Sequence, residues 1–260
     1  MSNFQPVSPS THIGRRWKRP DNWSFAATTG TVPVGAEEVN AVCMSMPIAI
    51  VQEGGQHLPV AMMALRPNEN LLVEAGGRWV GSYIPAVFRG HPFVLGQTDE
   101  GKTLLCVDAA NDTVTDGPEG EAFFLPDGKP TELLETVLKF QTAVTRGRAQ
   151  SVLACNALAA AGVLRPWDLV VEDVGGARRQ LEGMLRVDEP AMLALPDEAF
   201  GKLRGAGAVA MAYAQMLSMH HLSLLVQLAR QRLNTVPTKP AAGFDPANLS
   251  ISLGDTLKFS

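Results

Sequence analysis

The sequence PVAMMALRPNENLLVEAGGRWVGSYIPAVFRGHPFVLG, residues 59–96, combines short apolar runs and tight turns in one segment. Its first run predicts the return strand of a hairpin, 58–65, whose outgoing strand is 47–51. A Gly-Gly turn predicts two further short strands, at 71–73 and 78–80. Connections this short favour antiparallel pairing, because a parallel crossover needs about a dozen residues or more.

Outward from this segment, the pattern predicts one more hairpin and then helices. Strands 93–95 and 103–107 are expected to pair through the turn 98–101. A helix capped by Thr131, with apolar residues at 134–140, is predicted next, and a second helical run follows at 152–158. Residues 169–171 and 181–187 are expected to form a hairpin through Gly175 and Gly176. A long helix is predicted at 209–233. This order indicates an α+β fold, with a mainly antiparallel sheet in the N-terminal half and helices with an extra hairpin in the C-terminal half.

Three regions are expected along the chain. Residues 1–45 are rich in proline and predict an irregular N-terminal arm. Residues 46–233 form the α+β domain. Residues 234–260 form a C-terminal tail whose alternating apolar residues make a terminal hairpin possible.

Composition and charge exclude some classes of function. The formal net charge of -4 argues against general nucleic-acid binding, which needs a basic surface. The local basic run at 15–19 is typical of a solvated arm. Three widely spaced cysteines, Cys43, Cys106 and Cys155, are expected to be reduced and buried.

The sequence also gives expectations about the cellular compartment and about membrane insertion. The N-terminus has no apolar segment like that of a secretory signal peptide, which favours a soluble, cytoplasmic protein. Export to the cell surface without an N-terminal signal peptide is the alternative. Residues 205–229 contain no charged side chain, yet their six Gln, Ser and His residues would be costly in lipid, so a membrane span is not expected. An uncharged helix of this kind favours self-association into a homo-oligomer.

Known catalytic and cofactor-binding motifs are either absent from the sequence or lack the secondary structure that they require. Residues 205–210 match G-x-G-x-x-A, but a helix is expected before them, whereas a dinucleotide site needs a strand there. There is no phosphate-binding loop and no nucleophile elbow. The five histidines have no metal-ligand spacing, and the neighbours His220 and His221 point about 100° apart on a helix. We therefore expect no cofactor, no metal site and no assignable catalytic residue.

Arginine and aromatic residues gather toward the end of the opening segment. A guanidinium group offers a fixed fork of donors and an aromatic ring offers rigid apolar area, a combination suited to a carboxylate-bearing or extended peptide ligand. The alternative is a purely structural role in the core and in ion pairs. The candidate ligand-binding residues are Asn70, Arg78, Trp79, Tyr83, Arg89, His91 and Phe93.

The chain resembles the SapC family of bacterial surface-layer gene clusters from about residue 12 to residue 233. The segments that show the resemblance are WSFAA at 23–27, PIAIV at 47–51, PVAMMALRPNENLLV at 59–73, GGRWVGSYIPAVFRGHPFVL at 76–95, LLCVD at 104–108, GEAFFLPDGKP at 120–130, GVLRP at 162–166, GMLRVDE at 183–189, Leu195-Pro196 and AYAQMLS at 212–218. His91 departs from the family pattern, which has an aromatic residue there. The resemblance implies a place beside peptide-modifying or halogenase-like enzymes and outer-membrane receptors, and it assigns no catalytic residue.

These observations predict a non-enzymatic accessory or binding protein of a bacterial surface-layer or surface-peptide system, with a peptide or protein partner. One alternative is an enzyme that modifies peptides or small molecules, which would need a pocket with a histidine and a carboxylate. Another is a structural surface-layer component, although the chain has no repeats.

Overall fold

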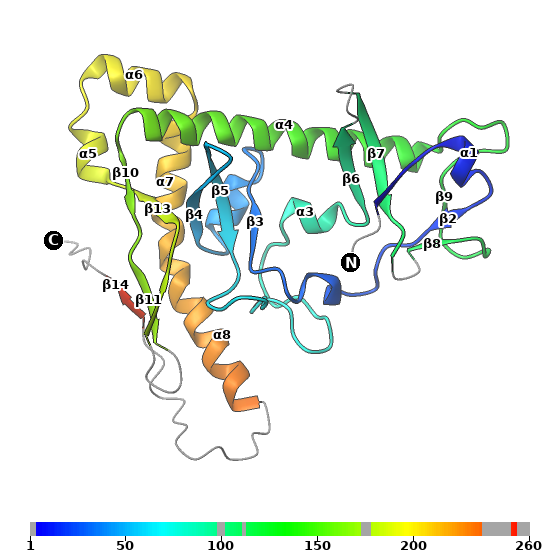
Figure 1. The fold of residues 1–260 in the computed structure, drawn as a ribbon, viewed down its shortest axis with the longest axis horizontal. Helices are drawn as coiled ribbons and strands as arrows, with labels where there is room; N and C mark the ends of the chain where they lie inside the picture. The colour runs from blue at the N-terminus through cyan, green and yellow to red at the C-terminus, as the bar shows by residue number, and fades with distance from the viewer. Residues whose placement is uncertain (1–3, 98–101, 111–112, 173–177, 236–250, 254–260) are drawn as a thin grey trace.

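The structure is a computed structural model that describes residues 4–97, 102–110, 113–172, 178–235 and 251–253. Its fold is α+β, as predicted, and the pairings between its described strands are antiparallel (Figure 1). The largest sheet has the strand order β10-β13-β4-β5-β3. Its strands are β3 (Thr31–Pro33), β4 (Ile48–Glu53), β5 (Gln56–Met62), β10 (Leu164–Pro166) and β13 (Met184–Val187).

Three smaller sheets surround it, with the orders β1-β7-β6, β8-β2-β9 and β12-β11-β14. Their strands are β1 (Phe4–Pro6), β2 (Arg16–Trp17), β6 (Phe93–Gln97), β7 (Thr103–Asp108), β8 (Val114–Thr115), β9 (Glu121–Ala122), β11 (Leu169–Glu172), β12 (Arg178–Leu181) and β14 (Ile251–Leu253).

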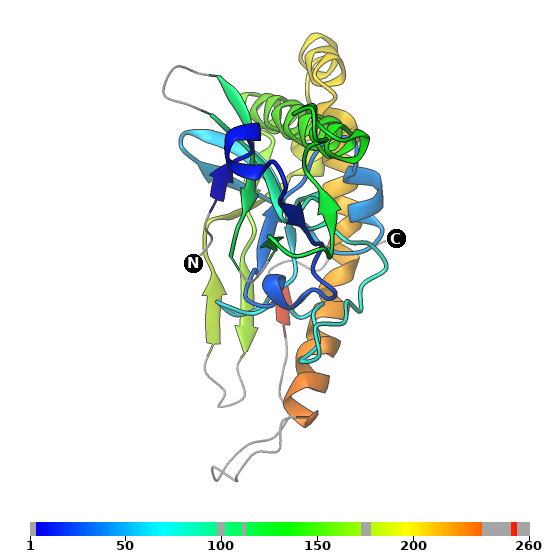
Figure 2. The same ribbon diagram turned by 90° about the vertical axis from the view of Figure 1, so that its right-hand side faces the viewer.

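One long helix, α4 (Glu132–Ala160), runs along the edge of the molecule past β5 of the large sheet and β6 of the β1-β7-β6 sheet (Figure 1). Figure 2 shows α7 (Ala208–Ser218) and α8 (Leu222–Thr235) stacked end to end in one column. The short helices are α1 (Pro9–His12), α2 (Val39–Cys43), α3 (Ala86–Arg89), α5 (Glu189–Leu193) and α6 (Asp197–Gly205), with single 3₁₀ turns η1 (Ser24–Ala26) and η2 (Met219–His221).

The main core lies between the large sheet, α4 and α7. Ile48 of β4, Cys155 and Leu158 of α4, and Ala212 of α7 are fully buried there. A separate cluster around Trp17, Phe93, Phe123 and Val137 joins the small N-terminal sheets to the start of α4.

Several predicted elements are confirmed. β4 pairs with β5, and β6 pairs with β7, as the two expected hairpins. The Thr131 side chain caps α4 by accepting a hydrogen bond from the Leu134 amide at 3.2 Å. The two apolar runs expected after Thr131 belong to this single continuous helix.

The predicted strands at 71–73 and 78–80 are reduced to one isolated bridge between Val73 and Trp79. The reason is local: the Leu72 amide donates its hydrogen bond to the Asn70 side-chain oxygen, so this donor does not take part in strand pairing. The segment therefore forms a turn-rich loop.

Within residues 4–45, part of the region expected to be an irregular arm, short strands pair with later parts of the chain. β2 lies between β8 and β9, and β3 forms the edge of the large sheet beside β5. Trp17, Val32 and Val42 are buried. Strands of two or three residues are too short to show a period of their own, so the sequence pattern does not reveal them.

The C-terminal half differs in detail. The strand expected at 181–187 divides: β12 pairs with β11, while β13 joins the large sheet beside β10 and β4. The long helix expected at 209–233 is interrupted by η2, which separates α7 from α8. The expected turns at 98–101 and at Gly175 and Gly176 lie outside the described residues. So does most of the tail, although Ile251–Leu253 pairs with β11.

The apolar stretch Ala208–Arg232 is long and hydrophobic enough to cross a membrane by length and composition, and 39% of its apolar window is buried in the protein. Core helices of soluble proteins share these properties, so the expectation of no membrane span stays a prediction. The G-x-G-x-x-A match lies between α6 and α7, with Gly207 in the left-handed conformation at φ +70°. A helix therefore precedes the match, as expected.

Candidate functional site

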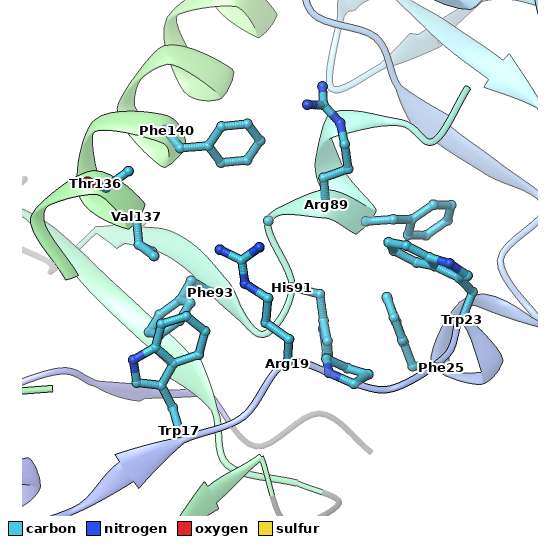
Figure 3. Close-up of a pocket in the computed structure, with 13 residues that line it drawn as sticks. Trp17, Arg19, Trp23, Phe25, Arg89, His91, Phe93, Thr136, Val137 and Phe140 are labelled. Carbon is cyan, nitrogen blue, oxygen red and sulfur yellow. The ribbon is translucent and has the colours of Figure 1, made fainter. Parts of the chain in front are cut away.

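A pocket of about 410 Å³ lies between the N-terminal segment 17–25, the connection from α3 to β6, and the first turns of α4 (Figure 3). We call it the aromatic pocket. Two arginines line it, Arg19 and Arg89, and no Asp or Glu of the described residues lines it. Six of its lining residues are Trp or Phe: Trp17, Trp23, Phe25, Phe88, Phe93 and Phe140. Its volume lies within the range of roughly 300–1,000 Å³ usual for small-ligand sites.

Gln141 of α4 holds the floor of the aromatic pocket in place. Its side-chain amide is buried and donates to the carbonyl oxygens of Gly90 at 3.0 Å and Phe93 at 2.6 Å. The Phe93 ring in turn meets the Trp17 ring edge to face, with centroids 4.7 Å apart. The floor is therefore fixed from two elements that are far apart in the sequence.

Arg89 is held by its own neighbours rather than left free. Its guanidinium group donates to the Ile84 carbonyl at 3.0 Å and to the Tyr83 hydroxyl at 2.7 Å. The same group lies over the rings of Tyr83 and Phe140, 5.3 and 5.5 Å from their centroids. In Figure 3 it extends away from Arg19. Arg89 thus forms a fixed positive edge of the pocket.

A buried carboxylate, Glu38, supports this edge. It accepts hydrogen bonds from the Tyr83 hydroxyl at 3.0 Å, from the Ala86 amide at 2.7 Å and from the Gly35 amide at 3.2 Å. Burial, together with the negative charge and hydrogen bond of Glu38, raises the pKa of Tyr83 to about 12, although Arg89 opposes the shift. Tyr83 therefore remains a neutral hydroxyl between Glu38 and Arg89 at physiological pH.

His91 and Phe25 form a stacked pair at the wall, with ring centroids 4.0 Å apart and planes 13° from parallel. Burial lowers the pKa of His91, and the nearby negative charge of Asp108 opposes this shift only in part. The His91 ring is consequently uncharged at neutral pH. It presents a flat face and adds no third positive charge to those of Arg19 and Arg89.

Arg19 is the cation that remains available to a ligand. Its guanidinium carbon lies 5.8 Å from the centroid of the Trp17 ring. Figure 3 shows its head group in the middle of the pocket, with Trp17 and Phe93 on one side and His91 on the other. Within the described part of the chain, its side chain makes no hydrogen bond and no ion pair. By contrast, Arg15 and Lys18 of the same basic run are paired with Asp116 and Glu119.

A second, more polar hollow of about 1110 Å³ adjoins the aromatic pocket. We call it the polar hollow. The two share five lining residues: Trp17, Arg19, Pro20, Phe25 and His91. The polar hollow is also lined by Lys18 and by the carboxylates of Asp21, Glu119 and Glu121. The pair of hollows therefore forms one groove with Arg19 and His91 at the boundary.

The structure brings four of the seven predicted residues together: Arg89, His91 and Phe93 line the aromatic pocket, and Tyr83 supports Arg89. Trp79 lies behind the wall, where its ring contacts those of Trp23 and Phe88.

Asn70 and Arg78 lie outside the lining of the groove. Asn70 is fully buried, and its side chain bonds the Leu72 amide and the Ala26 carbonyl. Arg78 forms an exposed two-pronged ion pair with Glu74, at 2.7 and 2.9 Å.

Sequence reasoning missed the lining residues that come from distant segments. Trp17, Arg19 and Phe25 belong to the predicted arm, and Phe140 belongs to α4. The available signal was the alternation of basic and aromatic residues between Arg15 and Phe25. Among the described residues, no group of three or more His, Cys, Asp or Glu side chains is placed to hold a metal ion.

Comparisons with known proteins give one match. Residues 7–225 match the family model described as SapC. No curated protein matches the chain, and no solved structure matches it.

Proposed function

Because the chain belongs to the SapC family, we propose that it is a non-enzymatic accessory protein of a bacterial surface-layer or surface-peptide system. Its role is to bind a peptide or protein partner. The observation that supports this proposal is the aromatic pocket, with its flat rings, two arginines and no carboxylate in its lining. Such a site suits an apolar group that bears a negative charge.

The rigidity of the aromatic pocket also supports binding. Gln141 fixes the floor, and Glu38 and Tyr83 fix Arg89. A preformed site loses little conformational entropy when the ligand enters, so binding needs no large rearrangement. Phe140 and Phe25, both only partly buried, supply apolar area at the opening.

An enzyme that modifies a peptide is the second candidate, and the polar hollow favours it. That hollow gathers His91 with the carboxylates of Asp21, Glu119 and Glu121. However, no hydrogen bond joins the His91 ring to these carboxylates in the described structure, and Glu119 is paired with Lys18. A general base is normally oriented by such a contact. We therefore favour binding without catalysis.

Selection from a random peptide library on the immobilised full chain tests the proposal. Phe140→Ala removes one wall of the aromatic pocket. Leu153→Ala is the matched control, because Leu153 is 66% exposed on the same helix and outside the pocket. We expect peptides to be enriched on the wild type and on Leu153→Ala, and to be lost on Phe140→Ala.

Two results would contradict the proposal. If no peptide is enriched on the wild type above the Phe140→Ala background, the aromatic pocket is not a peptide site. If enriched peptides change mass during incubation with the wild type but not with His91→Ala, the protein is an enzyme.

Location and assembly are part of the same proposal. We place the protein in the cytoplasm, with export to the cell surface as the alternative, and fractionation of the native cells distinguishes the two. Self-association through residues 205–229 stays a prediction. The α7 side chains Tyr213 and Leu217 are exposed on that segment, and a monodisperse monomer in light scattering would overturn it.

A further inference from the structure

The two hollows differ sharply in charge, although they are continuous. The aromatic pocket has two arginines and no acidic residue in its lining, whereas Asp21, Glu119 and Glu121 line the polar hollow. Lys18 offsets Glu119 through an ion pair at 2.5 Å. A negatively charged group is therefore favoured at the aromatic end of the groove and disfavoured toward the polar end.

Arg19 lies at the boundary between these two environments, since it lines both hollows. Its guanidinium carbon lies over the Trp17 ring, 5.8 Å from the centroid, and its donors are not taken by a described carboxylate or carbonyl. A carboxylate matches the fork of a guanidinium group with two parallel hydrogen bonds. The neighbouring His91 ring, uncharged and stacked on Phe25, adds apolar surface beside that position.

The volumes of the two hollows bear on how such a carboxylate is presented. The aromatic pocket is large enough for one bulky side chain, and the larger polar hollow leaves room for several residues of extended chain. The only carboxylate that every peptide carries beside its last side chain is the one at its C-terminus. An internal Asp or Glu would instead have peptide chain continuing on both sides of it.

We propose that the groove recognises the C-terminal end of a peptide. The terminal carboxylate binds Arg19, an aromatic or large aliphatic last side chain enters the aromatic pocket, and the preceding residues lie along the polar hollow. This inference rests on the proposed peptide-binding function and names the part of the partner that the site takes.

The test compares two forms of one random hexapeptide library, one with free C-terminal carboxylates and one with C-terminal amides, bound to the full chain. The protein variants are Arg19→Gln and, as the matched control, Arg15→Gln. Arg15 belongs to the same basic run, but its charge is already paired with Asp116 at 2.7 Å. Arg19 is exposed, so its substitution is compatible with folding, which circular dichroism checks.

We expect the free-acid library to bind the wild type about 10- to 100-fold more tightly than the amide library, as for a charge-assisted hydrogen-bonded pair. The enriched peptides should end in Phe, Tyr, Trp, Leu or Met. Arg19→Gln should abolish the preference for the free acid, and Arg15→Gln should retain it.

The outcomes separate this inference from the proposed function. Equal binding of the acid and amide libraries, with both lost on Phe140→Ala, overturns terminal recognition and leaves peptide binding intact. A free-acid preference that survives Arg19→Gln also overturns it. If neither library binds the wild type above the Phe140→Ala background, the proposed function fails together with the inference.

Discussion

Replacing Asn70 by alanine should destabilise the fold, because this buried side chain completes the backbone hydrogen bonding of the loop that follows β5. Its carbonyl oxygen accepts from the Leu72 amide at 3.0 Å, and its amide donates to the Ala26 carbonyl at 3.1 Å. The Leu72 amide would be left without a partner, at a cost of about 1–3 kcal/mol. The Ala26 carbonyl keeps its bond from the Thr29 amide and loses only one interaction, about 0.5–1.5 kcal/mol.

The expected loss in free energy of unfolding is therefore about 1.5–4.5 kcal/mol. It should appear as a lower urea midpoint and a melting temperature reduced by roughly 3–18 °C. Tryptophan fluorescence reports the transition, since Trp79 and Trp23 pack close to this loop. Arg78→Gln is the control: its exposed ion pair with Glu74 should contribute less than about 1 kcal/mol.

The same pair of variants separates a structural role for Asn70 from a role in binding. A stability within about 0.5 kcal/mol of the wild type, combined with a loss of peptide binding in Asn70→Ala, would refute the structural argument. It would place Asn70 in the ligand site, as the sequence pattern alone suggested.

Three further predictions concern single groups. The folded-state pKa of Tyr83 is raised to about 12 from its usual 10.0, so its neutral form contributes stability that is fully present below pH 10 and is lost as the pH rises toward 12. Ultraviolet titration of the Tyr213→Phe variant, in which Tyr83 is the remaining tyrosine, should show a midpoint near 12 that the added substitution Glu38→Gln lowers. A midpoint unchanged by Glu38→Gln would contradict this. Burial raises the pKa of the Cys155 thiol to about 12, so mass spectrometry should find it unmodified by iodoacetamide at pH 8 in the folded protein and modified in urea; alkylation as fast as that of the partly exposed Cys106 would disprove it. Gly120→Ala should reduce the free energy of unfolding in urea more than Gly128→Ala does. Both glycines have a positive φ, but a Cβ at Gly120 would lie 2.5 Å from the Trp17 carbonyl oxygen, whereas one at Gly128 would meet no atom within 4 Å. Equal losses would show that this contact relaxes freely.

The parts of the fold that sequence reasoning predicted are those with local causes. The alternation and turn of β4 and β5, and the Thr131 cap before the apolar period of α4, are encoded within a few residues of where they act. β2 and β3 were not predicted, because two- or three-residue strands are defined by partners far along the chain. Tertiary pairing decides such segments, and a single sequence does not display it.

The residues of the candidate site fall into the same two groups, those found from local sequence and those placed by tertiary packing. Arg89, His91 and Phe93 come from one short stretch of sequence, from the end of α3 to the start of β6, so a local cluster of arginine and aromatic residues was enough to find them. Arg19 reaches the pocket from the segment after β2 and Phe140 from α4, and only the packed structure places them there. Asn70 illustrates the opposite problem, because a buried amide that satisfies backbone groups and one that binds a ligand have the same appearance in a sequence.

Helix α4 constrains how this family can change over evolution. Phe140 near its start faces the aromatic pocket, while Ala154 and Leu158 near its end pack in the main core. Inserting or deleting one residue between them would rotate one set by about 100° relative to the other. Substitutions on the exposed face of α4 should therefore accumulate freely in relatives. Changes in the number of residues between Phe140 and Ala154 should be rare, because no single residue can be added without turning either the pocket wall or the core face away from its partners.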